Sequence, residues 1–152
     1  VLLACVAGPL AMLVGLGAWS LAGPASLISA VLALLSIALG ALLSATIVMW
    51  WNILTARTLS PLGSYAVGTP LAVLLSGMLL PLPIYPDWIR PFLLAQPFAG
   101  ITDIPIRIYL GTPIPGGAAT GLGLQIFWLT ALTLLGRLWM RQTVNRLEVQ
   151  GA

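Results

Sequence analysis

The first 56 residues of this 152-residue chain carry no charged side chain. Two further uncharged runs follow, at residues 58–86 and 108–136. About 20 apolar helical residues are enough to cross the hydrocarbon core of a bilayer. Only 6% of all residues are charged, whereas a soluble domain usually has about 25%. The sequence therefore predicts an integral membrane protein, and it excludes a soluble enzyme, a nucleic-acid binder and a disordered tail.

Breaks in these runs predict an all-α, polytopic bundle of four membrane-spanning helices. Gly23-Pro24 divides the first run, because glycine favours a helix end and proline the first turn of the next helix. Three prolines between residues 81 and 86 end the third helix. The expected helices cover 1–22, 25–54, 63–80 and 118–140, and a cytoplasmic tail covers 141–152, in a single transmembrane domain. Because the chain begins with Val1 and lacks a basic leader, we expect the N-terminal part of a longer protein to be missing.

The stretch 81–117 differs from these helices. It holds eight of the twelve prolines and four of the nine charges, yet it is apolar between them. Asp87 is a suitable N-cap for a short helix that reaches Leu93, and a second short segment is expected from Phe98 to Leu110. We interpret 81–117 as a re-entrant or interfacial helix pair; the alternative is a loop folded over the bundle.

The arginines predict the orientation, because cytoplasmic segments carry an excess of Lys and Arg. A cytoplasmic C-terminus places Arg57, Arg137, Arg141 and Arg146 inside. Arg90 and Arg107 then lie outside, where Asp87 and Asp103 balance them. The same topology places the start of the chain inside, so an even number of missing helices would precede it.

Few residues are able to carry chemistry. The chain has no His and only three carboxylates, at Asp87, Asp103 and Glu148. Asp87 and Asp103 are expected to cap helices or to pair with neighbouring arginines; an alternative is a lipid-modifying enzyme that uses both carboxylates at the outer interface. No metal or nucleotide site is predicted. The expected spanning helices have no internal charge, so any energy for transport should come from a partner.

Two patterns within the expected helices concern packing. Ser36, Gly40 and Ser44 recur every four residues, a spacing that lets helices approach closely. We expect this stripe to pack within the chain, with a dimer seam as the alternative. Gln125 either lines a pathway or bonds to a neighbouring carbonyl, and the sequence does not choose between the two. Cys5 is expected to be a buried, inert thiol.

From residue 63 onward, ordered motifs resemble the transmembrane subunit of bacterial ABC-2-type transporters, the permease partner of a separate ATPase. The motifs span about 90 residues, and residues 1–60 resemble the family by hydropathy alone. In chain order they are Ser76-Gly77-Met-Leu-Leu-Pro81, Tyr85-Pro86-Asp87-Trp88-Ile89, Gln96-Pro97-Phe98-Ala99, Pro105-Ile-Arg107-Ile-Tyr109-Leu-Gly111, Gln125-Ile-Phe-Trp128 and Arg146-Leu-Glu-Val149.

This resemblance implies a six-helix permease in a bacterial inner membrane, of which the chain is the last four helices. It further implies an ABC ATPase subunit that binds the ATP, a second permease chain in a homo- or heterodimer, and transport of an unknown substrate, for which we expect export. Nucleic acid is not among the expected partners, and no catalysis or cofactor is expected on the chain itself. Contacts to the ATPase or to lipid headgroups are expected from Arg57, Arg137, Arg141 and Arg146. In the outer segment 81–117, the candidate site residues are Asp87, Trp88, Arg90, Asp103, Arg107 and Tyr109.

Overall fold

The computed structural model describes residues 23–58 and 61–150, and all regular secondary structure in this part of the chain is helical. The helix expected at 1–22 lies outside the described residues. The elements are α2 (Leu27–Thr58), α3 (Pro61–Leu75), η2 (Leu82–Ile84), α4 (Arg90–Ala95), η3 (Pro97–Gly100), α5 (Asp103–Leu110) and α6 (Gly117–Gln150).

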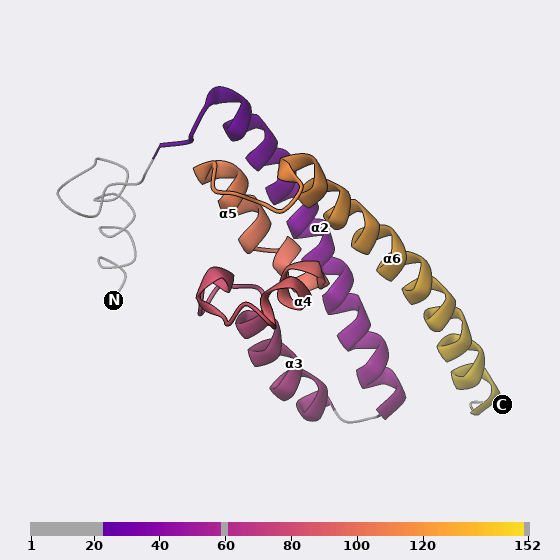
Figure 1. Cartoon of the computed structure of the whole chain (residues 1–152). Helices are drawn as coiled ribbons and strands as arrows, with labels where there is room; N and C mark the ends of the chain where they lie inside the picture. The colour runs from indigo at the N-terminus through magenta and orange to yellow at the C-terminus, as the bar shows by residue number, and fades with distance from the viewer. Residues whose placement is uncertain (1–22, 59–60, 151–152) are drawn as a thin grey trace, which may run out of the picture.

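Two of the described helices, α2 and α6, are long and apolar enough to cross a membrane, over Leu27–Thr55 and Gly117–Gln142. They lie side by side and run in the same direction (Figure 1). Their direction follows from their contacts, since Ser36 bonds to Gln125 and Trp50, later in α2, bonds to Leu132, later in α6. Both C-terminal ends therefore lie at one end of the bundle.

The ends of these two helices differ modestly from the predicted ones. The helix predicted at 25–54 covers Leu27–Thr58 in the structure, and the helix predicted at 118–140 covers Gly117–Gln150. Most of the expected tail is thus a helical continuation of α6, although the candidate span within this helix ends at Gln142. No proline or glycine lies between Arg137 and Gln150, so nothing in the local sequence ends the helix earlier.

A stripe of small and branched residues packs α2 against the rest of the chain. Ser36, Gly40, Leu43 and Ile47 are all buried and recur every three or four residues. A Cβ added to Gly40 would lie 2.9 Å from the carbonyl oxygen of Gly100. Ser36 and Gly40 thus pack within the chain, as expected, whereas Ser44 is only half-buried, and Leu43 and Ile47 continue the stripe in its place. Gly40 allows the backbone at Gly100 to touch α2 directly.

The third helix is shorter than predicted. α3 ends at Leu75 rather than at residue 80, and it is not among the two candidate spans. Ser76 and Gly77 form a turn, in which Gly77 adopts a φ of 80° that favours glycine. Trp51 of α2 lies directly on α3, because a Cβ at Gly68 would be 2.7 Å from its ring.

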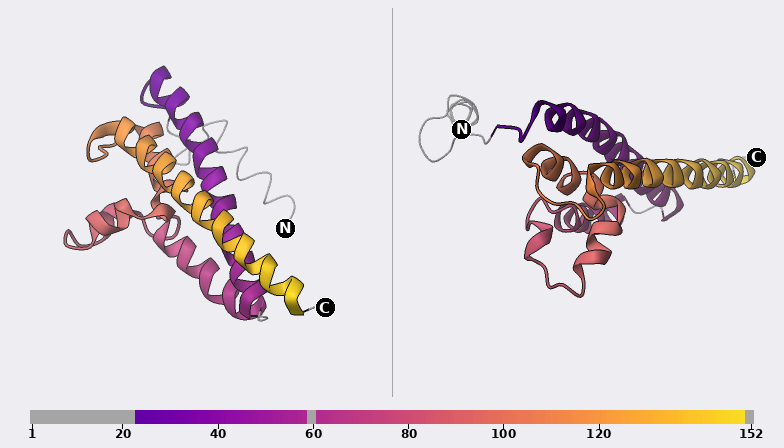
Figure 2. Two further views of the ribbon diagram at one scale, coloured as in Figure 1. Left: turned by 90° about the vertical axis from the view of Figure 1, so that its right-hand side faces the viewer. Right: turned by 45° about the horizontal axis from the view of Figure 1, so that its top comes forward.

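Between α3 and α6 the chain forms four short helical pieces, η2, α4, η3 and α5. They extend to one side of the α2–α6 pair in both views of Figure 2. α5 lies beside the N-terminal half of α2 in the opposite direction, since Tyr109 accepts a hydrogen bond from the Ala25 amide (3.0 Å) and Gly100 contacts Gly40. The segment predicted from Phe98 to Leu110 is thus helical but broken between η3 and α5.

Candidate functional site

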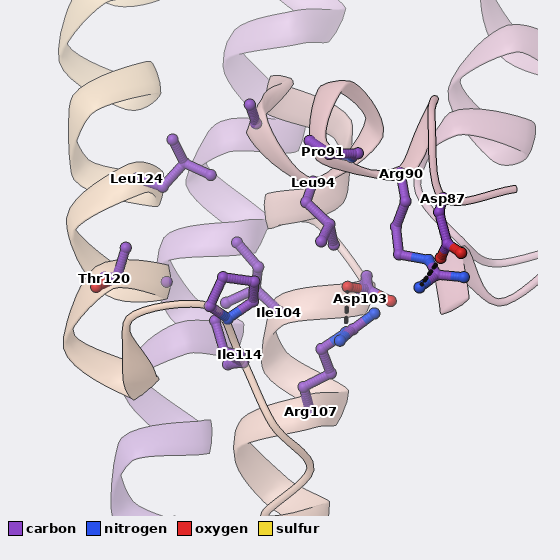
Figure 3. A pocket seen from close by; sticks show the side chains of 13 residues that line it. Asp87, Arg90, Pro91, Leu94, Asp103, Ile104, Arg107, Ile114, Thr120 and Leu124 are labelled. Atoms are coloured by element: carbon purple, nitrogen blue, oxygen red, sulfur yellow. Dashed lines mark hydrogen bonds and ion pairs between the residues drawn. The ribbon is translucent and has the colours of Figure 1, made fainter. Parts of the chain in front are cut away.

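A cavity of about 510 Å³ opens between α4, α5 and the first turns of α6 (Figure 3). Its polar wall combines two acid–arginine pairs, and the rest of its lining is largely apolar. The lining residues are Asp87, Arg90, Pro91, Leu94, Ala95, Asp103, Ile104, Arg107, Ile114, Pro115, Thr120, Gly121 and Leu124.

The inner pair of the cavity joins Asp103 and Arg107 on consecutive turns of α5. Arg107 Nε donates to Asp103 Oδ2 at 2.6 Å, and the two side chains are only 13% and 7% exposed. Nη1 of the same guanidinium donates to the Pro113 carbonyl at 3.0 Å, which ties α5 to the turn before α6. Gly111 ends α5 in the left-handed conformation, with a φ of 67°, so that the chain turns back toward this arginine.

Burial raises the pKa of the Asp103 carboxyl above its ordinary value, although the charge of Arg107 and its hydrogen bond act in the opposite direction. α5 is not one of the two candidate spans. The pair therefore holds a carboxylate that is easier to protonate than an exposed aspartate.

The outer pair joins Asp87 and Arg90, three residues apart before and at the start of α4. Arg90 Nη1 lies 2.7 Å from Asp87 Oδ1, and the Asp87 side chain is 91% exposed. Arg90 Nη2 also donates to the Tyr85 carbonyl at 2.9 Å. The predicted N-cap role of Asp87 is wrong, because Ile89 holds the N-cap position and no side chain caps α4. The alternative reading, a partner for Arg90, is confirmed.

Gln125 makes a buried bridge next to the cavity-lining residue Leu124. Its Nε2 donates to the carbonyls of Ser36 (3.0 Å) and Gly100 (2.7 Å), and its Oε1 accepts from Ser36 Oγ (2.9 Å). The side chain is 1% exposed. It therefore joins α2, η3 and α6. The sequence left two roles open for Gln125, and in the structure it bonds to neighbouring carbonyls.

Gln96 makes a second bridge, between α3, α4 and η3, which the sequence did not predict. Its Nε2 donates to the carbonyls of Leu75 (2.7 Å) and Leu93 (2.9 Å), and its Oε1 accepts from the Phe98 amide (2.9 Å). The carbonyl of Leu75, the last residue of α3, thus accepts a hydrogen bond from a side chain 21 residues later in the chain. The sequence marked Gln96 only as part of the Gln96-Pro97-Phe98-Ala99 motif, without a structural role.

The remaining predicted site residues lie elsewhere. Trp88 is 80% exposed and does not line the cavity. Tyr109 lies in the cluster around Ala33, Ile104 and Ile108 and lines a different groove beside α2. Arg137 and Arg141 are exposed on the C-terminal half of α6, in which Arg146 also lies, and Arg57 lies in the last turn of α2. No group of three or more His, Cys, Asp or Glu side chains that would bind a metal occurs in the described residues.

Comparison with known proteins decides the family. Residues 8–151 match the family described as ABC-2 family transporter protein. The chain belongs to this ABC-2 family. The resemblance from residue 63 onward is confirmed, and the match also includes most of the first 60 residues. No curated protein and no solved structure matches the chain.

Membership identifies this chain as a membrane component of an ABC-2 transporter. The motifs that carried the resemblance have structural roles in this ABC-2 chain. Gln96 and Gln125 make the two buried bridges, and Trp128 Nε1 donates to the Ala95 carbonyl at 2.7 Å. These motif residues do not line the cavity themselves, but their hydrogen bonds join α3, α4, η3 and α6, the elements around it.

Proposed function

We propose that this chain is the permease subunit of an ATP-driven exporter, paired with a second permease chain and driven by a separate ATPase subunit. The observation that carries the proposal is the ABC-2 family match over residues 8–151. Two apolar helices long enough to cross a membrane support it. In this proposal ATP binds and is hydrolysed on the partner, and the chain itself contributes the pathway.

The arrangement of the bundle supports a cytoplasmic C-terminus. Because α2 and α6 run in the same direction, Arg57 and the arginines at 137, 141 and 146 belong to the same end of the bundle. A basic end of this kind favours the cytoplasmic side. These arginines are our candidates for contact with the ATPase or with anionic headgroups of a bacterial inner membrane. We further propose that two helices precede this chain in the complete permease and that residues 81–117 form an outer re-entrant pair. Both expectations come from the ABC-2 resemblance.

Co-purification tests this proposal most directly. The full-length protein is extracted in mild detergent, and the subunits that accompany it are identified by mass spectrometry. We expect a nucleotide-binding subunit, two permease chains per complex, and ATP hydrolysis only when both kinds of chain are present. Hydrolysis by the purified permease alone, or its recovery as a monomer without an ATPase, would contradict the proposal.

The direction of transport needs a separate measurement. Inverted membrane vesicles that contain the complex should accumulate candidate substrates when ATP is added outside, where the ATPase is then exposed. Accumulation in right-side-out vesicles, energised from within, would instead indicate import. A variant of the ATPase that binds ATP without hydrolysing it is the control in both cases.

A second candidate function is supported by the position of Asp87 and Asp103 on one cavity. Two carboxylates at an outer interface suit a lipid-modifying enzyme. Each one is, however, paired with an arginine, which leaves neither as an unengaged base. Replacement of both by Asn discriminates between the functions. Loss of a lipid-modifying activity from a folded protein would favour the enzyme, and absence of such activity in the parent would remove it.

A further inference from the structure

Arg107 has donors that nothing in the described part of the chain uses. Its Nε and Nη1 bind Asp103 and the Pro113 carbonyl, whereas its Nη2 is buried and has no hydrogen-bond partner among the described residues. A buried donor without a partner is costly, so such groups usually meet a ligand or water. Arg107 lines the cavity, and Figure 3 shows its guanidinium directed toward the space that Arg90 enters from the opposite side.

The charge of the cavity limits what can meet this donor. Two carboxylates and two guanidiniums line it, and the net charge is zero. A ligand that is neutral overall and offers an anionic oxygen keeps this balance, whereas an anion would add an uncompensated charge in a largely apolar site. The carboxylate of Asp87, 91% exposed at the rim despite its pairing with Arg90, is a site for a cationic group.

The apolar part of the cavity and its depth indicate where such a ligand comes from. Leu94, Ile104 and Leu124 line it beyond the charged wall. Thr120 and Leu124 lie three and seven residues after the start of the α6 span at Gly117, which is about 5–10 Å along the helix axis. The cavity is therefore at the end of a candidate span, where lipid headgroups meet acyl chains.

We propose that this cavity binds a zwitterionic phospholipid of the bilayer. The Arg107 guanidinium turns on binding to bring its buried Nη2 to the cavity surface, where the phosphate accepts its hydrogen bonds, and the headgroup ammonium lies against the Asp87 carboxylate. The first part of an acyl chain then runs along Leu94, Ile104 and Leu124. The inference requires the membrane location but neither ATP nor a partner subunit, so it stands or fails independently of the proposed exporter.

Native mass spectrometry of the full-length protein, delipidated in detergent, measures this binding. Phosphatidylethanolamine is the zwitterionic probe, and phosphatidylglycerol is the anionic one. We expect the protein to retain phosphatidylethanolamine in preference. Soluble glycerophosphoethanolamine, which lacks acyl chains, should compete poorly. Equal retention of the two lipids, or efficient competition by the soluble headgroup, would overturn the proposal.

Two charge variants test the headgroup contacts. Arg107→Lys keeps a cation beside Asp103 but has no second terminal nitrogen, so we expect retention of phosphatidylethanolamine to fall about tenfold. Asp87→Asn removes the partner of the ammonium at an exposed position and should abolish the preference between the two lipids. Unchanged retention in Arg107→Lys, or an unchanged preference in Asp87→Asn, would contradict the assigned contacts.

A third pair of variants tests the cavity itself without touching either ion pair. Thr120 is exposed and lines the cavity, whereas its neighbour Ala119 is exposed and does not. Thr120→Trp should fill the space and reduce phosphatidylethanolamine retention, and Ala119→Trp should leave it unchanged. The same result from both variants would mean that the lipid binds elsewhere on the protein.

Discussion

The two acid–arginine pairs of residues 81–117 have similar sequence spacings and different environments. Asp87 and Arg90 are three residues apart at an exposed rim, and Asp103 and Arg107 are four apart and buried. An exposed pair contributes little to stability, because water screens it. A buried pair bears the cost of desolvation, which burial imposes here on the Asp103 carboxylate. The two carboxylates should therefore respond differently to loss of their arginines.

Replacement of Arg107 by Gln should make stability depend more strongly on pH. The pKa of Asp103 is already raised by burial. A carboxyl whose pKa is higher in the folded than in the unfolded state stabilises the fold at low pH, and this stabilisation is lost as the pH rises through the folded-state pKa. Arg107→Gln removes both causes that lower this pKa, so the pKa rises further and the loss of stability should extend to higher pH. The deficit in thermal unfolding temperature should therefore grow as the pH is raised from the ordinary aspartate pKa toward neutrality.

A double variant separates this effect from simple loss of packing. Asp103→Asn combined with Arg107→Gln has no titrating group at this position, and its deficit relative to the parent should be nearly constant over the same range. A deficit of Arg107→Gln that is equally large at every pH would refute the role assigned to Asp103.

Gln125 offers a test of the buried bridge between α2, η3 and α6. Gln125→Ala removes three hydrogen bonds, each worth about 0.6 kcal/mol between membrane helices, so a loss of about 2 kcal/mol is expected. Unfolding in detergent measures it. Gln142→Ala, at an exposed position of the same helix, is the matched control and should be neutral. Similar stability of both variants would show that the bridge contributes little.

At the scale of elements, the sequence predicts helices well where local signals end them. Gly23-Pro24 places the start of α2 within two residues, and Gly111 ends α5 where its motif ends. The end of α3 was missed because Met78, Leu79 and Leu80 continue the apolar run. α3 ends instead at the Ser76-Gly77 turn, where the Leu75 carbonyl accepts a hydrogen bond from Gln96, a distant residue. Hydropathy carries no information about such a contact.

The glycine of α2 that touches η3 provides a test at this scale. Gly40→Ala would place its Cβ 2.9 Å from the Gly100 carbonyl oxygen, so the backbone of η3 must move at a cost of about 1–3 kcal/mol. Gly123→Ala, in α6, meets nothing within 4 Å and should be neutral or stabilising by up to about 1 kcal/mol. Thermal unfolding of the two variants measures the difference. Equal effects would mean that η3 does not pack closely on α2.

For the molecule as a whole, the sequence identified two acid–arginine pairs within residues 81–117 but did not predict that both pairs line one cavity. Asp87 and Asp103 are 16 positions apart, and no spacing rule applies across a segment with this many prolines. The structure brings both pairs to one cavity because Gln96 and Gln125 hold the short helices in place. Trp88 and Tyr109, equally plausible in sequence, lie outside the cavity.

The common direction of α2 and α6 leads to a prediction about the whole molecule in its membrane. If the arginine-rich end is cytoplasmic, the turn between α5 and α6 is outside. In a Cys5→Ser background, which removes the native thiol, Thr112→Cys should react with a membrane-impermeant maleimide in intact spheroplasts. Gln142→Cys should react only after the membrane is permeabilised. Both side chains are exposed on the protein, and reaction of Gln142→Cys after permeabilisation shows that neither protein nor lipid shields this thiol. The reverse pattern would invert the topology and move the cavity to the cytoplasmic side, where the arginines could no longer be explained as topological signals.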